Sequence, residues 1–119
     1  MPEAAQVAPG IFRITVPIPF VLGSVNLYLV ETADGFLLID TGIATGEAFR
    51  AIREGLDHLG IGFDRISAIV VTHFHADHAG QAARLQALCH APVLMSAADA
   101  GYLADFTANG PPLGAEQFF

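Results

Sequence analysis

The chain has no lysine, and its positive charge comes from five arginines set against 12 acidic residues, giving a formal net charge of −7 at pH 7. Proteins that grip the phosphate backbone of nucleic acid carry a basic stripe that neutralises several phosphates. Because this sequence has no such stripe, nucleic acid is a disfavoured partner.

Cysteine is almost absent as well, since Cys89 is the only one. A single cysteine excludes an internal disulfide and fits a reducing compartment. The first ten residues, "MPEAAQVAPG", have neither the basic start nor the apolar stretch of a secretory signal. We therefore expect a cytoplasmic protein.

Long apolar runs are also missing, so no segment is expected to span a membrane. Apolar residues nevertheless make up 53% of the 119 positions. A domain of this size hides only part of such an apolar surface in one core, so a partner surface is expected. We expect one domain over residues 1–119, with a tail rich in proline and glycine from about residue 108.

Short apolar runs separated by turn residues predict strands. These runs are "GIFRITVPIP", "SVNLYLVE", "GFLLIDTG", "ISAIVVT" and "APVLMS". The first contains two prolines and is expected at a sheet edge. Asp34-Gly35 predicts a hairpin turn between the second and third runs. The continuous apolar run Phe36 to Ile39 is expected to be buried on both faces, and "ISAIVVT" to be a central strand.

Helical periodicity fills the gaps between the later strands. Apolar residues recur every three or four positions from Gly46 to Leu59, and Gly60 is a natural stop. In "AGQAARLQALCH", the residues Ala82, Leu85 and Leu88 mark one helix face. A capping box at "SAAD" predicts a third helix over about 97–105. The order predicts an α/β fold, with a mixed sheet and its helices on one face.

Metal-binding side chains gather in "THFHADHAG". In an extended segment His73 and His75 point to the same side, and Asp77 and His78 follow at the turn into the next helix. Imidazole and carboxylate are ligands for zinc, and also for iron or manganese. Asp77 could also be an ordinary helix cap among polar loop histidines. Chance rarely produces this spacing, so we favour a metal site.

This segment resembles the T-H-x-H-x-D-H signature of the metallo-β-lactamase superfamily, in the variant of its binuclear members such as glyoxalase II and lactonases. The stretches "SVNLYLVETADGFLLIDTG" and "APVLMSAADA" are similar to the flanking strands and helix of that family. The resemblance implies a four-layer αββα sandwich, of which this chain would form the N-terminal half.

The resemblance also implies roles for the four side chains. His73 and His75 would ligate a first metal ion, normally zinc, and Asp77 and His78 a second. Asp77 would also position the nucleophile and so take a catalytic role. The implied reaction is hydrolysis of a small ester, thioester, lactone or lactam by a metal-bound hydroxide. An iron-dependent relative such as a persulfide dioxygenase is an alternative.

Other polar residues could support the segment that carries the candidate ligands. The resemblance places Asp40 beneath the loop as its support, although a turn-capping role is common for aspartate at a strand end. Thr41 and Asn26 are weaker candidates for the same network. Cys89 and His90 lie too far along the next helix and are expected in the core and at a helix end, respectively.

The family site is incomplete within these residues. It needs a further histidine, a bridging aspartate and a final histidine, and no histidine follows His90. We therefore expect the isolated chain to be inactive. Without its second half, the inner face of the sheet would be exposed. That exposure predicts a homo-oligomer, a missing C-terminal half, or an inactive, truncated, self-associating half-domain.

Overall fold

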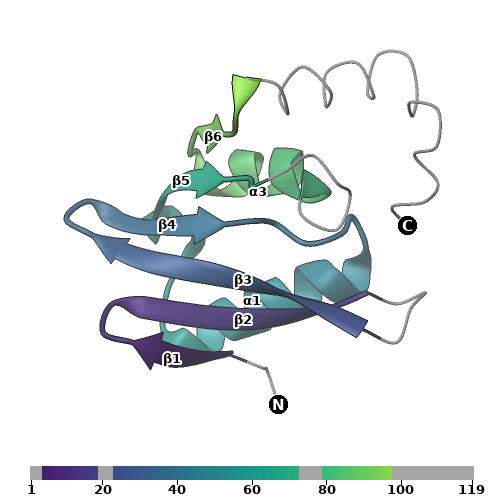
Figure 1. Cartoon of the computed structure of the whole chain (residues 1–119), viewed down its shortest axis with the longest axis horizontal. Coiled ribbons are helices and arrows are strands. Elements are labelled where there is room, and N and C mark those ends of the chain that lie inside the picture. The colour runs from purple at the N-terminus through teal and green to yellow at the C-terminus, as the bar shows by residue number, and fades with distance from the viewer. Residues whose placement is uncertain (1–3, 19–22, 73–78, 98–119) are drawn as a thin grey trace.

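The computed structural model describes residues 4–18, 23–72 and 79–97. Within them, one sheet of six strands follows the order of the chain, with neighbouring strands adjacent in space (Figure 1). The strands are β1 Ala4–Ala8, β2 Ile11–Ile18, β3 Gly23–Thr32, β4 Gly35–Ile39, β5 Ile66–Val70 and β6 Val93–Leu94. The helices are α1 Gly46–Leu59, the 3₁₀ turn η1 Phe63–Arg65 and α3 Ala82–Cys89.

The sheet is mixed. Strands β1 to β4 pair antiparallel, whereas β5 runs parallel to β4 and β6 runs parallel to β5. Antiparallel neighbours need only a short turn, and the predicted turn at Asp34-Gly35 joins β3 to β4. Parallel neighbours need a crossover, which α1 supplies between β4 and β5 and α3 between β5 and β6.

Helix α1 has the predicted limits because both ends are capped. The Thr45 side chain accepts a hydrogen bond from the Ala48 N–H, and Gly60 ends the helix with φ 74°. Gly55 allows the helix to approach β2 closely, since a Cβ there would lie 2.9 Å from Ile14 Cγ2. Glycine thus has a packing role in the middle of this helix.

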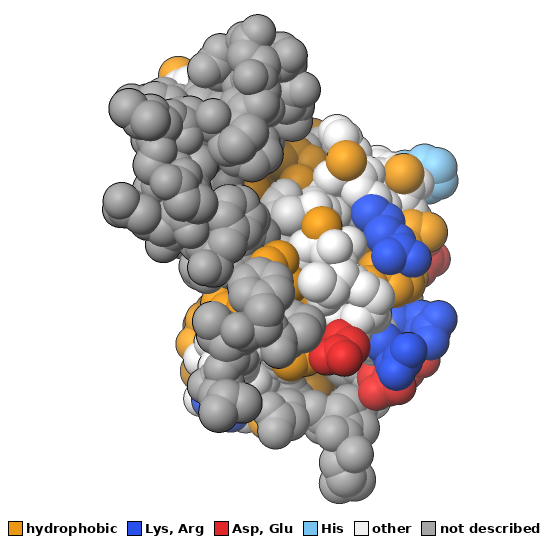
Figure 2. Space-filling view, turned by 90° about the vertical axis from the view of Figure 1, so that its right-hand side faces the viewer, with side chains coloured by type: hydrophobic (Ala, Val, Ile, Leu, Met, Phe, Trp, Pro, Cys, Tyr) orange, Lys and Arg blue, Asp and Glu red, His pale blue; other side chains and the backbone are white. Residues whose placement is uncertain are grey.

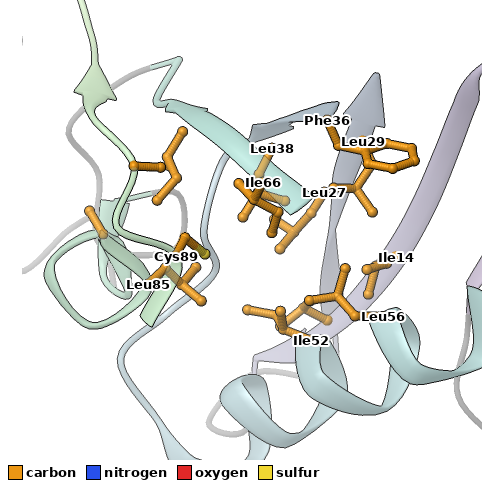
Figure 3. Close-up of a cluster of buried hydrophobic side chains, with 14 of the residues drawn as sticks. Ile14, Leu27, Leu29, Phe36, Leu38, Ile52, Leu56, Ile66, Leu85 and Cys89 are labelled. Atoms are coloured by element: carbon orange, nitrogen blue, oxygen red, sulfur yellow. The ribbon is translucent and has the colours of Figure 1, made fainter. Parts of the chain in front are cut away.

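The core lies between the helices and one face of the sheet. Figure 3 shows Ile52 and Leu56 of α1 beside Ile14, and Leu85 and Cys89 of α3 beneath the parallel strands. All five side chains are buried. Both helices therefore cover the same face, which confirms the predicted α/β class with helices on one side.

The predicted face of α3 is wrong at one position. Leu88 is 43% exposed, whereas Cys89 is buried together with Ala82 and Leu85. The buried residues are spaced by three and then four, which follows one side of a helix more closely than a strict spacing of three. Cys89 is therefore the core residue that we expected.

The position of the first predicted strand also needs correction. It forms β2, and the unpredicted strand β1 lies at the edge. Within the described residues, the β1–β2 pairing runs as far as Ala4 and Ile14, and Pro17 of β2 pairs with Ser24 of β3. Proline has no N–H to donate, and here its strand pairs with β3 on one side.

The run Phe36 to Ile39 is buried on only one face. Phe36 and Leu38 belong to the core, while Leu37 and Ile39 are half-buried on the opposite side of the sheet. "ISAIVVT" forms β5 and lies between β4 and β6, as expected for an internal strand. At β4, the face away from the helices is therefore apolar but partly exposed.

The third predicted helix, about 97–105, and the tail from about 108 fall almost entirely outside the described residues. Within the described part of the chain, neither helix is long and apolar enough to cross a membrane.

Candidate functional site at the ends of the histidine loop

The chain turns sharply as it leaves β4. Asp40 has φ 68° and Gly42 has φ 78°, both in the left-handed region. Aspartate tolerates this conformation better than most residues with a side chain, and glycine has no Cβ to oppose it. Asp40 is 6% exposed and Thr41 fully buried, so the turn places two polar side chains inside the protein.

Asp40 contacts Thr72, which directly precedes residues 73–80, called the histidine loop from here on. Its backbone N–H donates to the Val70 carbonyl at 2.7 Å, which attaches the turn to the end of β5. The Thr72 backbone N–H donates to Asp40 Oδ1 at 2.8 Å. The Thr72 hydroxyl lies 2.9 Å from Oδ1 and 3.0 Å from Oδ2. The carboxylate therefore fixes the chain directly before His73.

Thr41 contacts the residue that follows the loop. The Gln81 backbone N–H donates to Thr41 Oγ1 at 3.0 Å and lies 3.3 Å from the Gly42 carbonyl oxygen. The Thr41 hydroxyl in turn donates to the Gly42 carbonyl at 3.3 Å. Consecutive residues of one turn thus hold the two ends of the segment between Thr72 and Gln81.

The Gln81 side chain joins two helix starts. Its Nε2 donates to the carbonyl oxygens of Ile43 at 2.8 Å and Thr45 at 2.9 Å. Thr45 is the N-cap of α1, and Gln81 precedes the first residue of α3. With only 3% of its surface exposed, Gln81 is a buried polar side chain whose amide protons have partners. It ties the end of the histidine loop to the loop between β4 and α1.

The four predicted ligands, His73, His75, Asp77 and His78, lie outside the described residues. Among the residues that are described, no three histidine, cysteine, aspartate or glutamate side chains gather as a metal site would require. The structure does describe Asp40, the predicted support, and places it against Thr72 at the start of the loop.

The other polar residues considered from the sequence lie in different surroundings. Thr41 belongs to the network at the loop end, while Asn26 accepts a hydrogen bond from the Thr15 hydroxyl across β2 and β3. Cys89 is buried, and burial raises the pKa of its thiol to about 11. His90 caps α3 in a left-handed conformation, as expected for a residue at a helix end.

Gln81 is the site residue that the sequence did not reveal. A glutamine at the start of a helix carries no local signature, because its partners Ile43 and Thr45 are 38 and 36 positions away. Its burial could be found only from the tertiary structure.

The visible surface mixes charges. Figure 2 shows arginine side chains next to acidic side chains on the described part of the face in view. Arg84 of α3 lies over the Phe49 ring at 3.6 Å from its centroid, and Phe49 stacks on Phe63 at 6.2 Å. These contacts link α3, α1 and η1 at the surface.

Comparison with known proteins gives the family. The model of the metallo-beta-lactamase superfamily matches residues 21–116. The chain is 46% identical over 70 residues to "Probable metallo-hydrolase YqjP" of Bacillus subtilis, covering 59% of this chain and 22% of that protein. It is 35% identical over 82 residues to "Atrochrysone carboxyl ACP thioesterase nsrC" of Aspergillus novofumigatus, covering 67% of this chain and 24% of that protein.

Solved structures agree with these relatives. A metallo-beta-lactamase family protein from Thermus thermophilus has a TM-score of 0.71 and 29% identity, covering 95% of this chain and 42% of its own. A metallo-beta-lactamase from Cronobacter sakazakii has a TM-score of 0.73 and 28% identity, covering 91% and 39%. The chain thus spans about a quarter of the curated relatives and two fifths of these structures, in agreement with the expected half-length fold. From its sequence match and its sheet, this chain belongs to the metallo-beta-lactamase superfamily.

Proposed function

We propose that the chain carries part of the site of a metal-dependent hydrolase that acts on a small ester, thioester, lactone or lactam. The observation that supports this most directly is the pair of hydrogen-bonded attachments, Asp40 to Thr72 and Thr41 to Gln81, on either side of the histidine loop. The similarity to a metallo-hydrolase and to a thioesterase favours hydrolysis as the reaction class.

The donor set fits a metal ion. His73, His75 and His78 supply imidazole nitrogens and Asp77 a carboxylate, which together suit zinc, with iron or manganese as alternatives. Attachment of both loop ends lowers the entropy lost when these ligands are ordered. A bound metal ion would supply Lewis acidity and lower the pKa of a water molecule.

The described residues would act through the backbone of the loop. Asp40 would set the direction in which the chain leaves Thr72, and hence where His73 begins. Thr41 would do the same for the start of α3 after His78. Asp77 is proposed to position the attacking water in addition to binding metal.

Metal binding by the full chain tests this proposal. We expect Zn²⁺ or Co²⁺ to bind in calorimetric titration, and His73→Ala to weaken binding by more than about 100-fold, since even outer-shell changes cost 10–100-fold. His58→Ala is the matched control, because His58 is an exposed residue of α1. If the wild type binds the metal ion and His73→Ala binds it with the same affinity, His73 is not a ligand.

The substrate class needs a separate measurement. The family resemblance assigns three more ligands to the part of the fold that this chain lacks, so we expect metal binding without turnover. A panel of small esters, thioesters and lactones, assayed with zinc and the purified chain, measures this. Zinc-dependent hydrolysis that His73→Ala abolishes would support the hydrolase and refute the expected inactivity.

We also propose that the face of the sheet away from the helices meets another protein layer. The register places apolar residues in line on this face, with Tyr28, Ile39, Val70 and Leu94 as successive cross-strand partners. Leu94 is 51% exposed. The layer would be a second copy of the chain or the C-terminal half expected from the resemblance.

Size-exclusion chromatography at several concentrations tests whether a second copy of the chain binds this face. We expect the elution volume to fall towards that of a dimer as concentration rises, because a face of this kind is costly to leave in water. Leu94→Glu should shift the equilibrium towards the monomer, with Leu88→Glu on α3 as the control for an exposed leucine elsewhere. A monomer at every concentration would contradict self-association.

The single cysteine still leads us to propose a reducing compartment, such as the cytoplasm. The burial of Cys89 agrees with a structural thiol. Fractionation of the source cells would test it.

A further inference from the structure

We infer that Gln81 is a positioning residue for the histidine loop, an inference that rests on the metal-binding function proposed above. Gln81 lies three positions after His78 and is 3% exposed. A glutamine is seldom buried so completely unless its polar atoms have partners. Its role must therefore be sought in the contacts of its amide.

The amide is held in one orientation. Its Nε2 carries two protons, and two carbonyl oxygens accept from it, those of Ile43 at 2.8 Å and Thr45 at 2.9 Å. The backbone N–H of the same residue donates to Thr41 Oγ1 at 3.0 Å. With the approach of the same N–H to the Gly42 carbonyl at 3.3 Å, four contacts to the segment between β4 and α1 leave the start of α3 little freedom to shift.

The two ends of the loop depend on different residues. Asp40 holds the first end at Thr72 through its carboxylate. Thr41 and the carbonyls that follow hold the second end through Gln81. Loss of the Gln81 contacts would therefore release one end while the other stays attached. Ligands presented by a loop with one free end must lose more entropy on binding metal.

This predicts an effect on metal affinity beyond the effect on stability. Gln81→Met keeps the length of the side chain and removes both donors. We expect its affinity for Co²⁺, followed by the visible absorption of the bound ion, to fall about 10–100-fold, the usual range for residues that orient ligands. The hydrogen exchange of the residue 81 amide should be faster in the same variant.

Two controls separate positioning from folding. Gln86→Met makes the same change at an exposed position of α3 and should leave Co²⁺ affinity at the wild-type value. Ile52→Val removes a buried methyl group from α1 and lowers stability without removing a hydrogen bond at either end of the loop. It should leave the Co²⁺ affinity within about twofold of wild type, although its melting temperature falls.

The outcomes are distinct. A fall in Co²⁺ affinity in Gln81→Met, with the affinities of Gln86→Met and Ile52→Val close to wild type, supports the inference. Equal Co²⁺ affinities of Gln81→Met and wild type would overturn it and leave the proposed function standing, as would an equal fall in Ile52→Val. No Co²⁺ binding by the wild type would overturn both.

A milder variant covers the case in which Gln81→Met does not fold. Thr41→Val removes only the hydroxyl that accepts from the Gln81 N–H and preserves the side-chain shape. We expect a smaller fall in Co²⁺ affinity in the same direction. An unchanged affinity in a folded Thr41→Val chain would then overturn the inference.

Discussion

The carboxylate of Asp40 accepts the backbone N–H of Thr72 at 2.8 Å and its hydroxyl at 2.9 Å, across 32 positions of sequence. Asp40 follows β4 and Thr72 follows β5, so this contact joins the carboxyl ends of two parallel strands. At this edge the loops after the two strands meet. Asp40 and Thr72 are therefore brought together by the strand pairing.

Replacement of Asp40 should measure how much this contact contributes to the free energy of unfolding. Asp40→Ala removes the acceptor and places alanine at φ 68°. We expect the free energy of unfolding to fall by about 2–3 kcal/mol, because hydrogen bonds to charged groups contribute most. Asp40→Asn keeps one acceptor oxygen and tolerates the left-handed backbone, so its loss should be about 1 kcal/mol. Urea unfolding of both variants measures the difference, and equal losses would contradict the proposed contact.

The turn after Asp40 should tolerate no side chain at Gly42. A Cβ there would lie 3.2 Å from Val16 Cγ1, and the backbone has φ 78°. We expect Gly42→Ala to lower the free energy of unfolding by about 1–2 kcal/mol. Gly46→Ala is the control, since a Cβ at Gly46 meets nothing within 4 Å and alanine favours a helix. Thermal melting should show opposite shifts, and a neutral Gly42→Ala would refute the steric reason.

The surface stack of Arg84 on Phe49 should contribute modestly to stability. The guanidinium lies 3.6 Å from the ring centroid, and an exposed cation–π contact contributes about 0.5–1 kcal/mol. Arg84→Met should lose this amount, whereas Arg50→Met on exposed α1 surface should not. A double-mutant cycle with Phe49→Leu measures the coupling. A coupling energy of zero would show that the pair is only a neighbour contact.

Cys89 should make the protein less stable at high pH. Burial raises the pKa of its thiol from 9.0 to about 11. Above pH 9 the thiol ionises in the unfolded chain before it does so in the folded chain, which favours unfolding. Stability is therefore unaffected by this group below pH 9 and falls by roughly 1 kcal/mol per pH unit between pH 9 and 11.

Denaturant unfolding at pH 8 and pH 10 tests this prediction, with Cys89→Ala as the reference. The variant has no thiol to ionise, so its stability should change less between the two pH values than that of the wild type. Parallel pH dependence in both proteins would contradict it.

Much of the fold follows from local sequence. The caps at Thr45 and Gly60 set the limits of α1, and Asp34-Gly35 set the hairpin between β3 and β4. These features depend on neighbouring residues, whose preferences act over a few positions. The metal-binding pattern of "THFHADHAG" also lies in the sequence, because three histidines and one aspartate at close spacing need no distant partner to be recognised.

Tertiary structure decided which residues face inward. Leu88 and Cys89 are adjacent on α3, and only the packing of that helix on the sheet makes the smaller residue the buried one. β1 likewise could not be found from "AAQVA", because its strand character comes from pairing with β2. Such choices depend on which surface a segment meets.

The residues at the two ends of the histidine loop also differ in how far the sequence revealed them. The sequence by itself contained the four candidate ligands and, through the resemblance, pointed to Asp40. Only the tertiary structure showed that Thr41 and Gln81 lie together at the far end of the loop, because their hydrogen bond spans 40 positions. A buried glutamine is defined by its distant partners, and those partners come within reach only when β4 and β5 pair in the folded sheet.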